Sequence, residues 1–159
     1  MAHSTGVEVA SPPIAGEAAD AFFLTLGEAL RFHRAHADAS CGLHVHVNMR
    51  GATWDDLARV ARLWVKVEGA LWNAVAPSRR RVRAINHYCA ATGARLERAG
   101  VVTAQTTQDK VSALNAAHNG DRYFALNLTV FQSRGTVEIR MHHGTVNPVK
   151  IRQWAASMS

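Results

Sequence analysis

The sequence predicts an α+β domain in which a sheet packs one of its faces on helices. Segments 41–48 and 136–142 alternate apolar and polar residues, as strands with one buried face do. Segments 17–36 and 53–75 instead repeat apolar residues at intervals of three or four, as helices with one buried face do. Strands and helices in this combination predict a sheet whose apolar face is covered by a helical layer.

Length and composition indicate one globular domain. The chain has 159 residues, of which 48% are hydrophobic and 19% charged. The net charge of +6 favours anionic partners but does not choose among nucleotides, nucleic acid and membrane surfaces.

No apolar run approaches the roughly 20 residues of a membrane span, and no signal peptide is recognisable, so we expect a cytoplasmic protein without a membrane partner. Cys41 and Cys89 lack metal-ligand spacing and are expected to be reduced thiols.

The N-terminal part predicts a short strand followed by a helix. Residues 5–10 alternate apolar and polar side chains and place Glu8 on the polar face. Pro12 and Pro13 end this strand, because proline cannot donate to a sheet ladder. The helical pattern of residues 17–36 follows.

The central part predicts a long helix with clear boundaries. Thr53 and Asp56 match a capping box at its start, and Pro77 stops it. A basic cluster follows, which is either a solvated turn or a clamp for phosphate oxygens. Its members are Arg79, Arg80, Arg81 and Arg83. Residues 101–120 show no clear period and predict a loop or a weak helix.

Polar side chains of the predicted strands are expected to converge on the open face of the sheet. Residues 122–131 alternate as a third strand and form a hairpin with segment 136–142. The polar residues that would share this face are His44, His46, Asn127, Glu138, Arg140 and His142. Two histidines and a carboxylate are ligand types for a divalent metal, and arginine suits an anionic substrate. The alternative is that these groups only satisfy one another in a polar layer.

Five motifs, in this order and spacing, carry a resemblance to a known family. They are V-E-V-A-S-P-P, C-G-L-H-V-H-V, A-P-S-R-R, R-Y-F-A-L-N-L and G-T-V-E-I-R-M-H-H-G-T. The chain resembles the amidoligase family of glutamine synthetase-like carboxylate-amine ligases from Gly6 to Trp154. The resemblance implies a curved antiparallel sheet, backed by helices, that holds ATP and Mg²⁺ or Mn²⁺ on its open face. It also implies that ATP phosphorylates a small-molecule or peptide carboxylate, after which an amine displaces phosphate to leave an amide.

The resemblance implies a role for each matching residue. Glu8, His44 and Glu138 are similar to metal ligands of the family. Arg140 is similar to its substrate- or phosphate-binding arginine, and His46 to the histidine beside the nucleotide phosphates, so both are expected to take part in catalysis. Contacts with the nucleotide are expected from His46, Arg79, Arg80, Arg81 and Asn127. An acyl phosphate must be shielded from water, and residues 101–120 are the expected lid.

The chain departs from the family pattern at both ends. The family normally begins with an earlier strand that carries paired carboxylates, and it continues beyond the last helix. We therefore expect residues 1–159 to form a single amidoligase-like domain without the family's first strand or strands and its C-terminal part. Two alternatives to a ligase are a metal-dependent hydrolase and a catalytically degenerate module that binds a nucleotide or another anion. Exposed sheet edges would allow a homo-oligomer.

Overall fold

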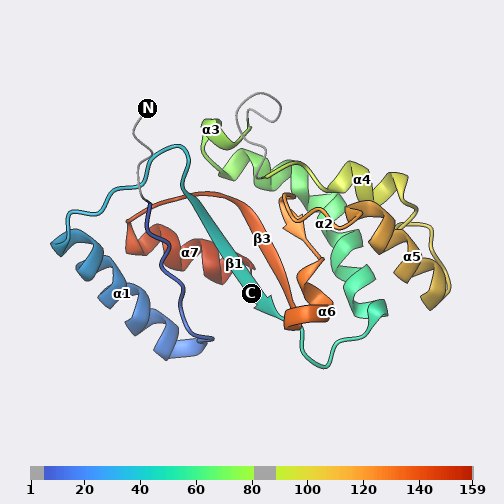
Figure 1. Ribbon diagram of the computed structural model, residues 1–159, viewed down its shortest axis with the longest axis horizontal. Coiled ribbons are helices and arrows are strands. Elements are labelled where there is room, and N and C mark those ends of the chain that lie inside the picture. The colour runs from blue at the N-terminus through green and yellow to red at the C-terminus, as the bar shows by residue number, and fades with distance from the viewer. Residues whose placement is uncertain (1–5, 81–88, 159) are drawn as a thin grey trace.

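The computed structural model describes residues 6–80 and 89–158, apart from the side chains of Ser78 and Arg80. It confirms the α+β class, with a three-stranded antiparallel sheet in the order β1-β3-β2 (Figure 1). The strands are β1 (Gly42–Asn48), β2 (Leu126–Asn127) and β3 (Thr136–His143). The helices are α1 (Gly16–Phe32), α2 (Trp54–Ala74), α3 (Pro77–Arg80), α4 (Gly93–Arg98), α5 (Thr107–His118), α6 (Val130–Arg134) and α7 (Pro148–Met158).

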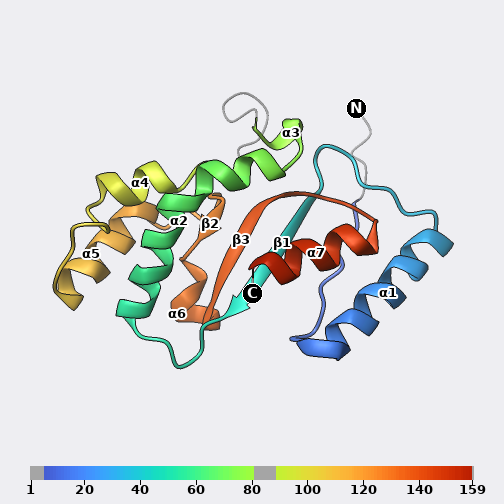
Figure 2. The same ribbon diagram turned by 180° about the vertical axis from the view of Figure 1, so that it is seen from behind.

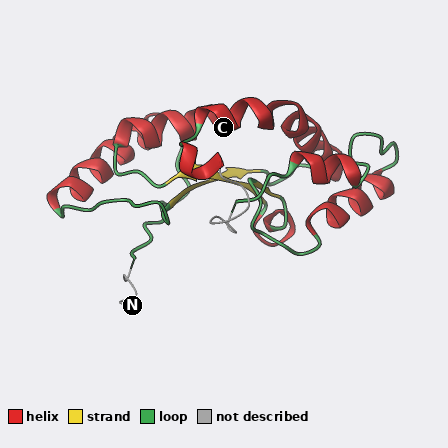
Figure 3. Cartoon of the chain, turned by 90° about the horizontal axis from the view of Figure 1, so that it is seen from above, coloured by secondary structure: helices red, strands yellow, loops and turns green. Residues whose placement is uncertain are grey.

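One face of the sheet packs on α2 and α7, as the alternation of apolar residues predicts. The helical layer lies on one side of the strands (Figure 3). Buried residues of α2, α7 and β3 form a common core with the partly buried aliphatic residues of β1. Its central members are Leu57, Ala61, Trp64, Val137, Ile139, Met141 and Trp154. The burial of these apolar groups is the main force that holds the sheet on the helices.

The helix α2 begins and ends where the sequence predicts. The side chain of Thr53 accepts a hydrogen bond from the Asp56 backbone, and the Asp56 carboxylate accepts one from the Thr53 backbone. This capping box satisfies two amides that the first helical turn leaves without partners. The helix stops before Pro77, and α7 likewise begins at Pro148 after the predicted cap Asn147, whose side chain accepts from Val149 N.

A β-bulge in β3 reverses the predicted orientation of His142. The register pairs Val45 with Ile139 but Leu43 with His142, so β3 contains one more residue than β1 in this interval. Residues directly opposite one another share a face, and His142 therefore lies with Leu43 on the helical side. Its ring is buried and packs 4.8 Å from the Trp154 ring. The predicted place of His142 on the polar face is thus wrong, because simple alternation does not anticipate the extra residue.

The N-terminal strand predicted at residues 5–10 is absent from its described part, residues 6–10. Residues 6–15 run as a coil between α1 and the sheet (Figures 1 and 2). Val7 is 89% exposed, and no strand among the described residues pairs with this segment. A strand needs a neighbour for its backbone groups, and among the described residues β1 pairs only with β3.

The third strand is much shorter than the alternation in residues 122–131 predicts. Within residues 122–131, only Leu126–Asn127 pairs with β3. The helix α6 replaces the end of the predicted strand. The Asn127 side chain accepts hydrogen bonds from the backbone and the hydroxyl of Thr129. A side chain that bonds the backbone two residues ahead turns the chain away from the sheet ladder.

Residues 101–120 contain the helix α5, which is the helical one of the two outcomes that their sequence predicts. Thr106 and Asp109 form a capping box for α5, which packs against α2 and α4. Lys110 makes an ion pair with Asp55 of α2 at 3.1 Å. In this position α5 contacts the helical layer, so the predicted lid would have to leave that packing to cover the open face. No helix among residues 6–80 and 89–158 is both long and apolar enough to cross a membrane.

The helix α1 contacts the rest of the fold mainly through α7. It ends at Phe32, four residues earlier than predicted, because Arg34 adopts a left-handed backbone with φ of 51°. Gly27 faces Pro148 at the start of α7, and Arg152 of α7 donates two hydrogen bonds to Asp20 of α1. The close approach at Gly27 lets the two helices pack.

We predict that Gly27→Ala destabilises the protein. An added methyl would lie 2.5 Å from Cγ of Pro148, whose ring cannot rotate away. Overpacking of this kind costs about 1–3 kcal/mol, which exceeds the gain of about 1 kcal/mol in helix propensity. The matched control is Gly69→Ala in α2, where nothing lies within 4 Å and the melting temperature should be unchanged or higher. A Gly27→Ala melting temperature as high as the control's would contradict the α1–α7 packing.

Candidate functional site

The carboxylate of Glu138 is the centre of the polar face. Glu138 lies in the middle of β3 and is only 5% exposed. Its Oε1 atom accepts a hydrogen bond of 2.6 Å from Arg140 and lies 3.3 Å from Nδ1 of His44 and 3.6 Å from Nε2 of His46. Its Oε2 atom accepts a hydrogen bond of 2.7 Å from the side-chain amide of Asn127. The structure therefore brings together five residues that the sequence predicts to share this face.

The register of the sheet explains this convergence. His46 lies directly opposite Glu138 on β1, and Asn127 lies directly opposite it on β2. Opposite residues in antiparallel strands have Cβ atoms about 5 Å apart, so their side chains can meet. Arg140 and His44 reach the same carboxylate because each is two residues from a member of this row.

The surroundings of Glu138 favour its ionised form. Burial alone would raise the pKa of the carboxyl group. The hydrogen bonds from His44 and Asn127 and the charges of Arg140 and His46 outweigh burial and lower the pKa to about 2. Glu138 is thus a permanent negative charge at neutral pH, held between cationic or polar groups.

The two histidines form the accessible part of the site. The side chain of His44 is 31% exposed and that of His46 is 36% exposed. Burial lowers the pKa of His46 despite the neighbouring charge of Glu138. Nδ1 of His46 lies 3.1 Å from the hydroxyl of Thr136. A neutral ring with its proton on Nε2 satisfies both contacts, because the hydroxyl can donate to Nδ1 and Nε2 can face the carboxylate.

Arg140 is held between Glu138 and an aromatic ring. Its side chain is 11% exposed, and its guanidinium carbon lies 5.7 Å from the ring centroid of Tyr123. The Tyr123 ring has a second guanidinium, that of Arg122, at 5.2 Å. A cation near an aromatic face is stabilised by the ring quadrupole. These contacts orient Arg140 on the polar face, above the central strand β3.

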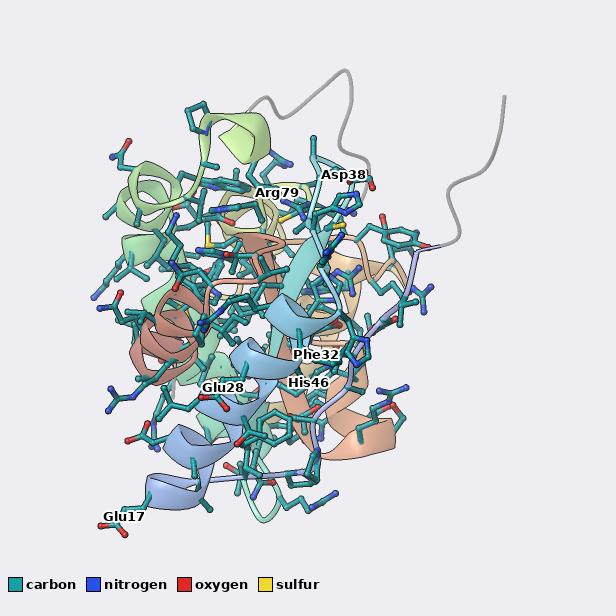
Figure 4. All side chains as sticks on the ribbon, turned by 90° about the vertical axis from the view of Figure 1, so that its left-hand side faces the viewer. Glu17, Glu28, Phe32, Asp38, His46 and Arg79 are labelled. Atoms are coloured by element: carbon teal, nitrogen blue, oxygen red, sulfur yellow. The ribbon has the colours of Figure 1, made fainter. Side chains whose placement is uncertain are left out.

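Of the three arginines that are predicted to bind the nucleotide, the structure describes the side chain of Arg79. Arg79 is buried and donates a 2.5 Å hydrogen bond to the carbonyl of Cys41 at the start of β1 (Figure 4). A methyl on Gly42 would lie 2.8 Å from Nε2 of His44 and 3.0 Å from Nη2 of Arg79. The guanidinium of Arg79 is therefore a neighbour of the His44 ring. Burial lowers the pKa of Arg79. The side chain of Arg80 and all of Arg81 lie outside the described residues, as does Arg83.

Two other candidates lie away from the Glu138 carboxylate. Glu8 is exposed in the coil of residues 6–15 and makes no contact with the cluster. His142 lies on the helical side of β3, where its ring stacks on that of His143. Neither residue joins the cluster in this arrangement.

Two threonines belong to the site although no sequence motif points to them. Thr136 contacts His46, and Thr129 holds the oxygen of the Asn127 side chain. Thr136 is two residues before Glu138, so strand alternation alone could have placed it on the polar face. The contact of Thr129 arises from the turn into α6, which the predicted long strand does not contain.

The donor types of the cluster suit a divalent cation, but their present arrangement does not form a cation site. Imidazole and carboxylate groups are common ligands of Zn²⁺, and carboxylates are common ligands of Mg²⁺. Within the described ranges, no three His, Cys, Asp or Glu side chains surround a common position for a metal ion. Oε1 of Glu138 instead faces the guanidinium of Arg140.

We predict that Glu138 stabilises the fold most strongly above pH 4.5. Because the folded protein lowers the pKa of this carboxyl from 4.5 to about 2, the stabilisation is fully present above the ordinary value and is lost as the pH falls toward 2. Urea unfolding of the wild type and Glu138→Gln between pH 7 and pH 2.5 measures it. The difference in free energy of unfolding should shrink below pH 4.5. A difference that is independent of pH would contradict the proposed ionisation.

A comparison with known families matches the entire chain, residues 1–159, to the family described as "Putative amidoligase enzyme". No curated protein and no solved structure matches the chain. The family match covers the strands that carry His44, His46, Glu138 and Arg140, whose side chains form the cluster described above. The resemblance stated from the sequence motifs is thus confirmed, and the chain belongs to the amidoligase family.

Proposed function

We propose that the protein is an ATP-dependent carboxylate-amine ligase that forms an amide through an acyl phosphate. The observation that carries this proposal is the convergence of His44, His46 and Arg140 on the ionised carboxylate of Glu138, on a partly exposed face of the sheet. The family match supports a ligase-type enzyme. A glutamine synthetase-like arrangement, with the nucleotide on the open face of the sheet, is part of the proposal.

The groups of the polar face suit anionic substrates. ATP and a carboxylate both carry negative charge, and phosphoryl transfer needs positive groups around the transferred phosphate. Arg140 lies beside Glu138 and Arg79 lies beside His44, so each can contribute positive charge there. His46 is neutral at pH 7, because burial lowers its pKa, and its ring can hold or accept a proton next to a bound anion.

Mg²⁺ or Mn²⁺ would be held by Glu138 and His44, with Glu8 as a further predicted ligand. When bound, such a cation neutralises the phosphate oxygens and polarises the transferred group. An ionised carboxylate has about four lone-pair sites, so Glu138 could bind a cation in addition to the hydrogen bond that it accepts from Arg140.

The substrates are proposed as a small-molecule or peptide carboxylate and an amine. The polar face has room beside the histidines, because roughly a third of each of their side chains is exposed.

Homo-oligomer formation stays a prediction, and one observation on the described part of the sheet bears on it. β1 is an edge strand with no strand on its outer side among residues 6–80 and 89–158.

A second candidate function is a module that binds anions without turnover. The contact between Arg140 and Oε1 of Glu138 favours it, because the guanidinium gives the buried carboxylate a cationic partner without a metal ion. Such a module would bind nucleotides or other anions with an affinity that does not depend on Mg²⁺. The two candidates therefore differ in a measurable cation dependence.

Titration calorimetry with a non-hydrolysable ATP analogue, with and without Mg²⁺, tests the proposal. Binding that requires Mg²⁺ supports the ligase, and phosphate release with panels of carboxylates and amines then identifies substrates. Equal binding in both conditions supports the anion-binding module. Absence of binding overturns the nucleotide-dependent proposal, and retention of zinc after purification would favour the hydrolase alternative.

We predict that Glu138→Gln and His44→Ala each weaken Mg²⁺-dependent binding of the analogue by at least about tenfold. Glu138→Gln keeps the shape of the side chain but removes its charge, and His44→Ala removes an imidazole next to it. The matched control is Glu28→Gln on the exposed side of α1, which should bind as the wild type does. Circular dichroism confirms that each variant is folded. Unchanged affinity in both site variants would refute the assignment of the site.

A further inference from the structure

The side chain of Asn127 is entirely enclosed, which separates it from the accessible part of the site. Asn127 is 0% exposed, whereas the histidines on the other side of Glu138 reach solvent. A bound ligand on the polar face would therefore meet the histidines and Arg140 before it could meet this amide. Among the described residues, the acidic group that accepts a hydrogen bond from this amide is Oε2 of Glu138, at 2.7 Å.

Two hydrogen bonds from Thr129 fix the orientation of this amide. The Thr129 backbone N–H donates to Oδ1 of Asn127 at 3.0 Å, and the Thr129 hydroxyl donates to the same atom at 2.7 Å. An amide oxygen accepts but cannot donate, whereas the NH₂ group only donates. Because Oδ1 is the atom that receives both Thr129 donors, the NH₂ group must point at Glu138.

The hydroxyl of Thr129 donates a hydrogen bond to Asn127, although Thr129 occupies the N-cap position of α6. Thr129 is the N-cap residue of α6, and threonine at this position ordinarily accepts from an amide of the first helical turn. In this structure the Thr129 side chain makes no capping hydrogen bond. The hydroxyl therefore does not stabilise the first turn of α6. It hydrogen-bonds instead to the Asn127 amide, which in turn donates to the Glu138 carboxylate.

We propose that Thr129 and Asn127 are positioning residues that hold the Glu138 carboxylate in its working orientation. With Oε2 bound by Asn127, the other oxygen is directed at His44, His46 and Arg140. A glutamate side chain has three rotatable bonds, and the anchored Oε2 removes the freedom of the outer two. This inference rests on the proposed function only in the catalytic purpose that it gives to the carboxylate. The positioning itself concerns Thr129, Asn127 and Glu138, which are already in contact.

The predicted role of Asn127 as a nucleotide contact becomes an indirect one under this proposal. The amide would act on the ligand through Glu138, which explains why an enclosed residue belongs to the site. Thr129, two residues further on, holds the Asn127 amide, and it can do so because the chain turns into α6 at this point.

The test compares Thr129→Val, Thr129→Ser and the wild type by NMR at a fixed pH of 8. Valine has the shape of threonine but lacks the hydroxyl, whereas serine keeps it. In Thr129→Val we expect the side-chain NH₂ group of Asn127 to exchange with solvent roughly three- to tenfold faster, the loss expected for one hydrogen bond. The ring signals of His44 and His46 should also shift, because the carboxylate beside them is no longer held in one orientation.

The serine variant and a distant threonine serve as controls. Thr129→Ser should restore both the slow exchange and the wild-type ring signals. Thr107→Val on α5 removes an exposed hydroxyl 3.3 Å from Asp55 and should leave both signals unchanged. A merely structural role of Thr129 would lower the melting temperature without moving the histidine signals, and that result would overturn the proposal.

The readouts distinguish this proposal from the proposed function. Exchange of the Asn127 amide and the histidine ring signals are measured without nucleotide, metal or substrate. If the protein fails to bind ATP but Thr129→Val moves these signals and Thr129→Ser restores them, the positioning role stands and the ligase proposal falls. If the signals stay unmoved in a protein that binds ATP with Mg²⁺, the ligase proposal stands and the positioning role falls.

Discussion

The buried negative charge of Glu138 is the constraint on which the polar side of this fold depends. An ionised carboxylate without partners would be strongly destabilising in the interior. Here every strand of the sheet supplies a partner: His44 and His46 from β1, Asn127 from β2, and Arg140 from β3 itself. The three strands must keep their register for these contacts to exist, so the charge and the sheet stabilise each other.

The same contacts give the site its chemical character. Glu138 stays ionised because the hydrogen bonds and charges around it outweigh its burial, and His46 is neutral at pH 7 because its own burial outweighs the carboxylate. A fixed negative charge, a neutral imidazole and a guanidinium within a few ångströms can bind cations and anions in turn. This combination suits a reaction in which an anionic carboxylate receives a phosphoryl group from an anionic nucleotide, as the ligase proposal requires.

The described helices serve the site by holding the opposite face of the sheet. The core between α2, α7 and β3 leaves the polar face without a helical cover from these two helices. A second buried carboxylate, Glu68 of α2, accepts hydrogen bonds from Trp64 and from the backbone amides of Thr92 and Gly93 at the start of α4. It ties α4 to α2 and takes no part in the Glu138 cluster. The molecule thus uses one buried carboxylate for packing and another for the site.

Local patterns in the sequence were sufficient for much of the fold. The alternation in β1 and most of β3, the capping box of α2 and the proline at the start of α7 each act over a few residues. Their structural consequences depend on steric and hydrogen-bonding rules that hold in any protein. The family motifs and the shared face of His44, His46, Asn127, Glu138 and Arg140 could therefore be predicted without coordinates.

Contacts between distant segments decided what the sequence alone could not. The bulge in β3 depends on how two strands 90 residues apart align, and it turned His142 toward Trp154. The length of β2 depends on the bonds between Asn127 and Thr129 as well as on pairing with β3. The exposed residues 6–10 remain coil because no strand of the described ranges pairs with them. The sequence determined which residues alternate and which chemical groups they carry. Only the tertiary structure decided their register and enclosure, because these depend on the free energy of packing and pairing between segments, which no local pattern contains.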